Sequence, residues 1–242
     1  MGLQSTYVTN TKIQAMFSCQ NLSKKNLFDK VSISVNPGQI VFLIGSNGSG
    51  KTSLFNNLAM LDQADSGSIV VDNLGFLFPI NFNPNIYPKI TMVSQGELLY
   101  PHLNVQNNIF LAAPTKQSKF DELIDYFGIR SLLIRFPHEL SGEQKQIITL
   151  VRLLILEPKY LLLDEVTSAL DSNRIKLVCK YLKSLKSKNV GIILISHSMM
   201  LVKKLADKIY FFDSGKIVEF GDISILDKPV TNKLKNYIEF NL

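Results

Sequence analysis

The sequence predicts an α/β fold built around a mainly parallel β-sheet. Short apolar runs recur along the chain, and segments with apolar residues at helical spacing stand between them. Strands that alternate with helices are typical of parallel sheets, because a parallel connection needs a crossover long enough to hold a helix. A block from about 97 to 157 shows only helical patterns, which indicates a helical insertion into this fold.

The N-terminal part of the chain is expected to be rich in strands. Its predicted strands lie at 17–22, 31–35, 40–44, 68–71 and 90–93. An Asn36-Pro37-Gly38 turn follows the second strand, and a helix is predicted over 52–61. Residues 72–90 are expected to be irregular, since Pro79, Pro84 and Pro88 interrupt them.

The helical block contains two well-marked helices. Apolar residues from Phe120 to Phe127 recur at helical spacing and stop at Gly128. Ser141, with Glu143 and Gln144 close behind, is expected to cap a helix that runs through Leu156 and stops before Pro158. The remaining predicted elements are strands at 160–163 and 191–195, helices at 172–187 and 198–206, and a hairpin of 208–212 with 216–220.

A glycine-rich loop between the strand at 40–44 and the following helix predicts a phosphate site. Glycines let the backbone wrap closely around an anion, and the helix start points N–H groups and a positive dipole end at it. Lys51 can reach the outer phosphates, and the Thr52 hydroxyl can ligate Mg²⁺. The candidate nucleotide-binding residues are Gly45, Ser46, Asn47, Gly48, Ser49, Gly50, Lys51, Thr52 and Ser53.

Two adjacent carboxylates end the apolar strand at 160–163. Ligands of an open α/β sheet bind at the carboxyl ends of its strands, so Asp164 and Glu165 are expected near the phosphate loop. Asp164 would hold Mg²⁺ beside Thr52, directly or through water. Glu165 would face another direction and could activate an attacking water.

Composition narrows the classes of partner. The 242 residues include 26 Lys and Arg against 20 Asp and Glu, a net charge of +6. This excess suits anionic ligands or an anionic membrane surface, and it is too small and dispersed to predict nucleic-acid binding. Cys19 and Cys179 lie far apart and the chain has no His cluster, so neither a metal site of Cys and His ligands nor a disulfide framework is expected. The longest apolar run, Ile147–Leu156, contains Arg152 and is too short to span a membrane.

Four further motifs resemble those of ABC-type ATPases. Leu140-Ser141-Gly142-Glu143-Gln144 resembles the LSGGQ signature, and Gln95 matches the Q-loop. Ser168-Ala169-Leu170-Asp171 matches the D-loop, and His197 the H-loop. The resemblance covers about residues 17–222. It implies a P-loop NTPase core, an antiparallel β subdomain and an inserted α-helical subdomain at about 97–157. The expected domain spans 16–222, between a disordered leader (1–15) and a short C-terminal tail (223–242).

The resemblance implies a composite site in a head-to-tail pair of such domains, either a homodimer or a paired ATPase subunit. One face would supply Lys51, Thr52, Gln95, Asp164, Glu165 and His197, while the opposite subunit would supply Ser141 and Gly142 at the γ-phosphate of ATP. In the family pattern the catalytic residues are Glu165, His197, Lys51 and Gln95. The Mg²⁺ residues are Thr52, Gln95 and Asp164.

The chain departs from the family pattern at three positions near these motifs. Glu143 stands where a second glycine is usual, Val166 replaces a common proline, and Ile147 replaces a common arginine. A carboxylate about 4 Å from a phosphate would cost on the order of 4 kcal/mol at intermediate dielectric. We therefore expect the Glu143 side chain to point away from the nucleotide.

The adenine contact is the least defined part of the expected site. The family usually stacks adenine on an aromatic residue after the first strand, but residues 21–27 contain none. Phe28 is the nearest aromatic residue, and its spacing to Val31 and Ile33 suits a core role. Lys25 or an aliphatic contact is the alternative, and weak selectivity between ATP and GTP would follow.

The sequence thus predicts the ATP-hydrolysing subunit of an ABC transporter that works with a separate membrane permease. The motifs look most like the branch for polar amino-acid uptake, with a solute-binding protein as a further candidate partner. Residues 98–103 are either a permease contact or a buried connector. The expected location is cytoplasmic, peripheral on the inner face of the cell membrane. The alternatives are a lipid or lipoprotein export ATPase, a non-transport ABC ATPase and an inactive nucleotide-binding scaffold.

Overall fold

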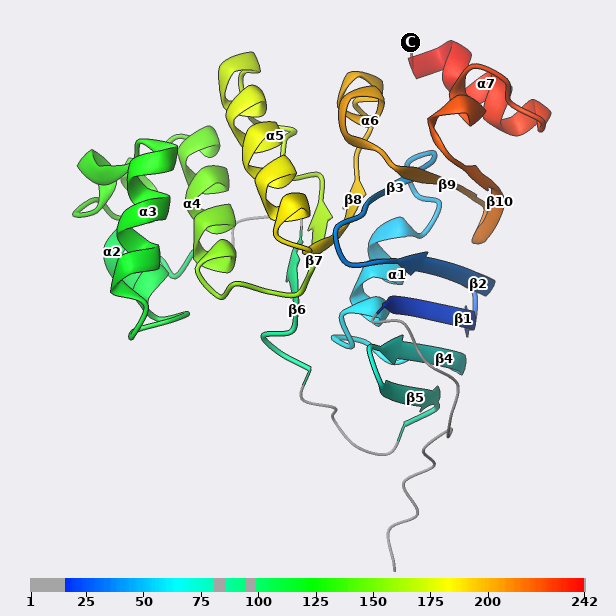
Figure 1. The fold of residues 1–242 in the computed structure, drawn as a ribbon, viewed down its shortest axis with the longest axis horizontal. Coiled ribbons are helices and arrows are strands. Elements are labelled where there is room, and N and C mark those ends of the chain that lie inside the picture. Colours follow the sequence, from blue (N-terminus) through cyan, green and yellow to red (C-terminus); the bar gives the residue numbers. More distant parts are fainter. Residues whose placement is uncertain (1–15, 81–85, 95–98, 242) are drawn as a thin grey trace, which may run out of the picture.

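The computed structural model describes residues 16–80, 86–94 and 99–241, and within these ranges the chain forms two sheets and the helices around them (Figure 1). The expected leader, residues 1–15, lies outside the described residues. The larger sheet has six strands in the order β10-β9-β3-β8-β7-β6. Their bounds are β3 Ile40–Ile44, β6 Ile90–Val93, β7 Tyr160–Asp164, β8 Gly191–Ile195, β9 Lys208–Asp213 and β10 Lys216–Gly221. All neighbouring pairs are parallel except β9 with β10. The predicted α/β fold with a mainly parallel sheet is confirmed.

The central strands of this sheet are buried on both faces. In β3, Phe42 joins one hydrophobic core with the helices at 142–154, 172–187 and 199–205, while Val41 and Leu43 join a second core with α1 (Lys51–Leu58) and the smaller sheet. Successive side chains of a strand point to opposite faces, so an unbroken apolar run is what a strand between two layers requires. The continuous run at 40–44 therefore reflects the layered position of β3.

The smaller sheet is antiparallel, with the order β2-β1-β4-β5. Its strands are β1 Phe17–Lys24, β2 Phe28–Val35, β4 Ser66–Val71 and β5 Leu74–Phe78. The expectation that residues 72–90 are irregular was wrong for β5, which pairs with β4 from Val71↔Leu74 to Gly67↔Phe78. Asp72 and Asn73 form the two-residue turn, and Asp72 takes the positive φ of 55° that such tight hairpins favour.

The helical block of the described chain comprises α2 (Val105–Phe110), α3 (Gln117–Phe127) and α4 (Gly142–Leu154), grouped at one end of the molecule in Figure 1. α3 ends at Gly128 in the left-handed conformation, as the sequence predicts. The helix expected to run through Leu156 ends at Leu154. α5 (Ser172–Ser187) has its predicted bounds, and α6 spans Met199–Leu205.

The C-terminal segment folds back onto the larger sheet. A short 3₁₀ turn at Ile223–Leu226 precedes α7 (Asn232–Asn241). Leu234 is fully buried in the same core as Phe211 of β9, and the rings of Tyr237 and Phe211 lie 5.3 Å apart. The segment expected only as a tail thus contributes to the packing of the core.

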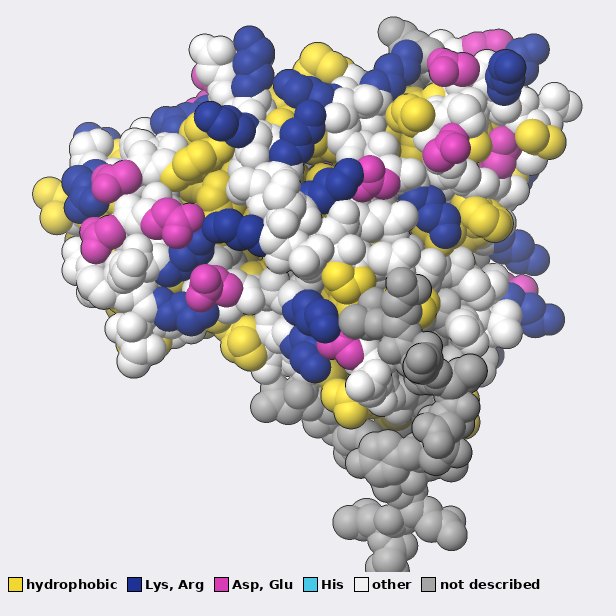
Figure 2. All heavy atoms as spheres, viewed as in Figure 1, with side chains coloured by type: hydrophobic (Ala, Val, Ile, Leu, Met, Phe, Trp, Pro, Cys, Tyr) yellow, Lys and Arg dark blue, Asp and Glu magenta, His cyan; other side chains and the backbone are white. Residues whose placement is uncertain are grey.

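Figure 2 shows Lys and Arg side chains gathered over α5 and α6, whereas on the rest of this face Asp and Glu side chains lie among the Lys and Arg side chains. Within the described part of the chain, none of the helices combines the length and apolar character needed to cross a bilayer.

Asp72 links the smaller sheet to the base of β7. Its carboxylate accepts hydrogen bonds from the Tyr160 hydroxyl (2.6 Å) and lies 2.8 Å from the Lys159 ammonium. Burial alone would raise the pKa of Asp72, but the hydrogen bonds from Lys159 and Tyr160 outweigh it and hold the pKa below its ordinary value. The charged form of Asp72 therefore stabilises the fold.

Asp72→Asn is expected to lower the free energy of unfolding by about 1 kcal/mol at pH 7, because the ion pair with the half-exposed Lys159 is lost. A carboxylate with a lowered pKa stabilises the native state at neutral pH, and this contribution is lost as the pH falls through that pKa. Urea unfolding from pH 7 downward should therefore show the two proteins converging in acid. Asp29→Asn, which changes an exposed pair with Lys216, is the matched control and should be neutral. A deficit of constant size at every pH would contradict the assignment.

Candidate active site

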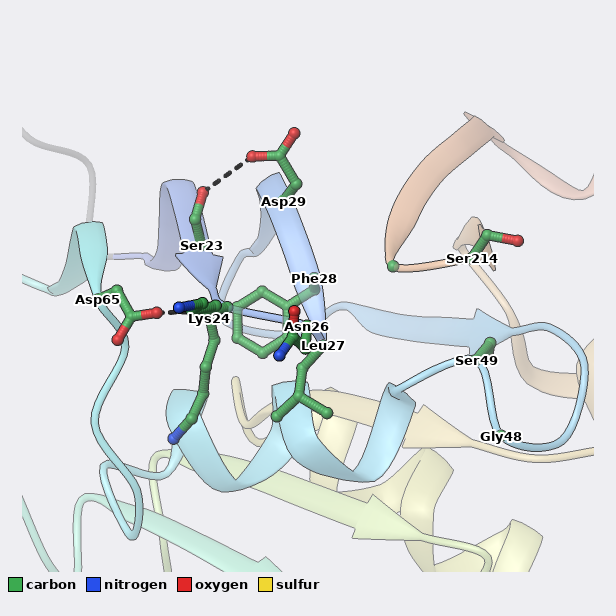
Figure 3. A pocket seen from close by; sticks show the side chains of 12 residues that line it. Ser23, Lys24, Asn26, Leu27, Phe28, Asp29, Gly48, Ser49, Asp65 and Ser214 are labelled. Atoms are coloured by element: carbon green, nitrogen blue, oxygen red, sulfur yellow. Dashed lines mark hydrogen bonds between the residues drawn. The ribbon is translucent and has the colours of Figure 1, made fainter.

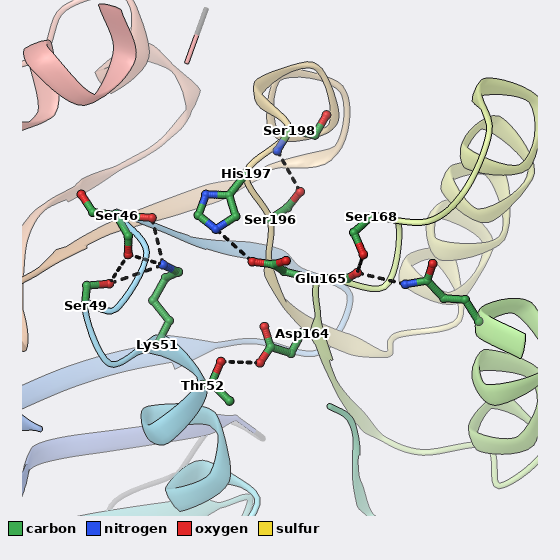
Figure 4. A network of polar contacts seen from close by, with 12 residues as sticks. Ser46, Ser49, Lys51, Thr52, Asp164, Glu165, Ser168, Ser196, His197 and Ser198 are labelled. Atoms are coloured by element: carbon green, nitrogen blue, oxygen red, sulfur yellow. Dashed lines mark hydrogen bonds and ion pairs between the residues drawn. The ribbon is translucent and has the colours of Figure 1, made fainter. Parts of the chain in front are cut away.

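The candidate site lies where three neighbouring parallel strands, β3, β8 and β7, end at one edge of the sheet (Figure 4). Their register aligns Leu43 with Ile195, and Ile195 with Asp164. The residues that follow each strand therefore emerge side by side. They are the phosphate loop after β3, Glu165 after β7 and His197 after β8.

The phosphate loop depends on glycine where it leaves β3 and where it enters α1. A Cβ on Gly45 would lie 1.9 Å from the Phe212 carbonyl oxygen of β9, so only glycine fits there. Gly50 has φ 101° and forms the start of α1 without any side-chain cap. The first N–H groups of α1 thus have no capping side chain, the arrangement that suits an anion at a helix N-terminus.

Lys51 lies across the loop and is almost fully buried. Its ammonium donates to the carbonyl oxygens of Gly45 (2.9 Å) and Ser46 (2.7 Å). Burial lowers the pKa of Lys51, while the carboxylates of Glu165 and Asp164 act in the opposite direction. The amine is thus held inside the loop, next to the space that a phosphate group would occupy.

Thr52 and Asp164 form an oxygen-rich pair beside the loop. The Thr52 hydroxyl donates to Asp164 Oδ2 at 2.7 Å. Asp164 is buried, and burial raises its pKa; the neighbouring Glu165 adds to this rise, while the Thr52 hydrogen bond opposes it. A hydroxyl and a carboxylate are oxygen ligands of the kind that Mg²⁺ prefers, together with substrate phosphates. The predicted pairing of Asp164 with Thr52 is present in the structure.

Glu165 and His197 face each other across the site (Figure 4). His197 Nε2 lies 2.9 Å from Glu165 Oε1, although the ring and the carboxylate lack the alignment of a good hydrogen bond. Glu165 has a backbone φ of 52°, and its N–H donates to the Ile195 carbonyl of β8. This turn directs the Glu165 side chain away from that of Asp164, so the two acids can serve different roles.

Gln146 of α4 fixes the segment after β7, a role that the sequence analysis missed. Its amide nitrogen donates to the Glu165 carbonyl at 3.1 Å, and its amide oxygen accepts from the N–H of Ala169 at 3.1 Å. The Ser168 hydroxyl donates to the same Glu165 carbonyl. Gln146 thus couples the helical block to the predicted base. Gln146 follows Glu143, Gln144 and Lys145 in the polar first turns of α4, so nothing in the sequence singled it out.

Ser141 and Gly142 begin α4 as expected. Ser141 caps the helix by accepting from the Gln144 N–H, and the Gln144 side chain accepts from the Ser141 N–H. No hydrogen bond or ion pair within the described ranges joins Ser141 or Gly142 to the phosphate loop. Gln95, expected to sense Mg²⁺ and to link it to the helical block, lies outside the described residues.

The Glu143 carboxylate turns toward α5, where Arg174 Nε lies 3.3 Å from its Oε1. The same guanidinium donates through Nη1 to the Phe127 carbonyl at 2.6 Å. The expectation that Glu143 faces away from a bound nucleotide stays a prediction, and this intramolecular ion pair supports it. Arg174 carried no signal in the sequence.

A cavity of about 550 Å³ adjoins the phosphate loop on the side of the smaller sheet (Figure 3). It lies between the loop after β1 and residues Gly48 and Ser49. Asp65 shapes it by accepting from the Lys25 N–H at 2.6 Å. Phe28 also borders the cavity, but it is 4% exposed and packs in the hydrophobic core. The cavity is the space next to the loop that a nucleoside could enter.

A family model described as ABC transporter matches residues 28–168. The arginine transport ATP-binding protein ArtP of Haemophilus influenzae is 32% identical over 230 residues, which cover 89% of this chain and 94% of that protein. The glutamine transport ATP-binding protein GlnQ of Geobacillus stearothermophilus is 34% identical, covering 78% of this chain and 81% of that protein. A solved dimeric structure of a bacterial ABC transporter cassette has a TM-score of 0.78 at 21% identity, covering 86% of this chain and 99% of that one.

Gly45→Ala is expected to destabilise the protein by about 3 kcal/mol, because the new methyl group must displace the backbone of β9. Chemical denaturation measures this change. Gly75→Ala is the matched control: a Cβ at Gly75 of β5 meets no atom within 4 Å, so that variant should unfold like the wild type. Equal stability of the two variants would show that the loop does not need glycine at position 45.

Proposed function

This chain belongs to the ABC transporter family, and we propose that it is the ATP-hydrolysing subunit that drives a separate membrane permease. The convergence of Lys51, Asp164, Glu165 and His197 on one phosphate loop carries this proposal. An ordinary strand-to-helix turn has no need of a buried lysine, a buried aspartate and a glutamate–histidine pair at one edge of a sheet.

The arrangement fits hydrolysis of a phosphoanhydride. The phosphates would lie on the N–H groups of the loop and of α1, with Lys51 balancing their charge. Glu165 would take a proton from a water molecule as the water oxygen bonds to the γ-phosphorus. The bond between the γ-phosphorus and the bridging oxygen breaks, and ADP leaves. His197, 2.9 Å from Glu165, would orient that carboxylate and contact the γ-phosphate.

The oxygen atoms of Thr52 and Asp164 would hold Mg²⁺. The distance of 2.7 Å between Thr52 Oγ1 and Asp164 Oδ2 is short enough for both to contact one ion or its water shell. The ion would neutralise negative charge on the phosphates. Among the described residues, groups of three or more His, Cys, Asp or Glu side chains with metal-site spacing are absent. This suits a magnesium ion that takes its remaining ligands from phosphate and water.

The site in one chain is half of the proposed assembly. Ser141 and Gly142 begin α4, which lies in the helical block of Figure 1, apart from α1, into which the phosphate loop leads. The N–H groups at this start of α4 would therefore serve the ATP of a second subunit. The similar cassette solved as a dimer supports this arrangement. Each ATP would then be enclosed by two chains, and its hydrolysis would let them separate.

The proposed cargo class is a polar amino acid, supported by the relatives named for arginine and glutamine transport. A permease, with a solute-binding protein where transport is inward, would select the cargo. The names of these two relatives favour amino-acid transport over lipid export or a non-transport ATPase. The proposed location is the cytoplasmic face of the cell membrane, where ATP is available.

Of the segment expected at 98–103, residues 99–103 are described, and we propose this part as the contact with the permease. The buried Asn108 of α2 fixes its backbone, accepting from the Tyr100 N–H at 2.7 Å and donating to the Leu103 carbonyl at 2.8 Å. This clamp leaves Tyr100 41% exposed with Arg152 packed over its ring. A rigid loop with an exposed aromatic side chain suits recognition of a partner helix. Leu99, in contrast, is buried and serves the core.

Glu165→Gln is expected to lower ATP turnover at least about 100-fold, because the amide cannot accept the proton of the attacking water. ATP binding should persist, since the loop and Lys51 are unchanged. Release of phosphate is measured with the chain assembled on its permease, and binding with a fluorescent ATP analogue. Glu157→Gln removes an exposed carboxylate paired with Lys116, away from the site, and serves as the control. If the wild type and Glu165→Gln both failed to release phosphate with the permease present, the proposed ATPase activity would be contradicted.

ATP and GTP are expected to bind with affinities within about tenfold of each other, a difference of about 1.4 kcal/mol. Among the described residues that line the cavity beside the loop, none is an exposed aromatic residue on which adenine could stack. Competition between the two nucleotides for the purified chain measures the ratio. A strong preference for ATP would show that the loop after β1 recognises adenine by other contacts.

A further inference from the structure

Glu143 places a negative charge at a helix start that is proposed to face ATP. It lies in the first turn of α4, directly after Gly142. A carboxylate there stabilises the helix through its dipole, but it also opposes the binding of a phosphate at the same N-terminus. The chain therefore needs a means to compensate this charge.

Arg174 is held where it can provide that compensation. Its Nε lies 3.3 Å from Glu143 Oε1, and its Nη1 donates to the Phe127 carbonyl at the end of α3. Its own N–H is fixed by the Asp171 carboxylate, which caps α5. The side chains of Glu143 and Arg174 are 29% and 32% exposed, so the pair is partly shielded from water. These contacts hold the guanidinium between the ends of three helices.

We propose that Arg174 is a positioning residue that holds and neutralises the Glu143 carboxylate, so that the start of α4 can accept the phosphate of ATP bound to a second subunit. The inference rests on the proposed function. The family's usual signature has an uncharged glycine at the position of Glu143. In this chain the ion pair with Arg174 would have the same effect, because it balances the Glu143 charge. An arginine that served only to join α4 to α5 would make no difference to the charge that ATP meets.

The test compares ATP turnover of the full chain on its permease in the wild type, Arg174→Ala and the double variant Arg174→Ala/Glu143→Gly. Arg174→Ala should raise the KM for ATP or lower turnover by about fivefold at low salt, because the Glu143 charge is released. The deficit should shrink at high salt, which screens that charge. Glu143→Gly should restore turnover to near the wild-type value although the Phe127 contact remains lost.

Arg130→Ala is the matched control, since Arg130 forms exposed ion pairs with Asp121 and Asp125 of α3. It should leave turnover unchanged. A double variant as impaired as Arg174→Ala would assign Arg174 a purely structural role and overturn the inference. An Arg174→Ala variant equal to Arg130→Ala would do the same.

A second readout separates this inference from the proposed function. In a Glu165→Gln background ATP is retained, so ATP-dependent association of two chains can be followed by size-exclusion chromatography. Adding Arg174→Ala should weaken this association, and adding Glu143→Gly as well should restore it. A wild type that hydrolyses ATP while these changes have no effect would overturn the inference alone. A Glu165→Gln chain that never associates, together with an inert wild type, would overturn both.

Discussion

The parallel register of β3, β8 and β7 is the constraint on which the site depends. The register aligns Leu43, Ile195 and Asp164, so the three strands end side by side at the same edge of the sheet. A slip of one residue in any strand would exchange its two buried faces and withdraw its functional side chain. Because all three strands are buried on both faces, the fit of their side chains into the two cores on either side of the sheet fixes that register. Stability and site geometry thus have one origin.

Much of this framework could be predicted because its signals are local. The apolar runs at 40–44 and 191–195 and the helix at 172–187 have their predicted bounds. β5 was missed because it is an edge strand with Leu74 and Leu77 exposed, which leaves no alternation to detect. The Asp72-Asn73 pair was its available signal, since both residue types tolerate the conformation of a two-residue hairpin turn.

The residues of the candidate site also divide into those that the sequence predicts and those that only the folded chain reveals. The phosphate loop and the Asp164-Glu165 pair are contiguous in the chain, so their chemistry could be predicted. Gln146 and Arg174 act on residues far along the sequence, through contacts that only the folded chain creates. A side chain that bridges two elements leaves no periodic pattern, because its partner is chosen by packing. The residues that support the site are for this reason harder to find than those that contact a ligand.

Charge balance connects these supporting residues. Asp164 and Glu165 bring two acids to a largely buried edge, and Lys51 with His197 supplies the nearby basic groups. At the start of α4 a third acid, Glu143, meets Arg174 in the same manner. Both places are proposed to meet the phosphates of ATP, which add further negative charge. An unpaired carboxylate at the phosphate loop or at the start of α4 would weaken the binding of ATP. An acid there that takes no part in the reaction therefore needs a cation held next to it. Arg174, paired with Glu143, thus supplies a fixed positive charge at the start of α4, as Lys51 does at the phosphate loop.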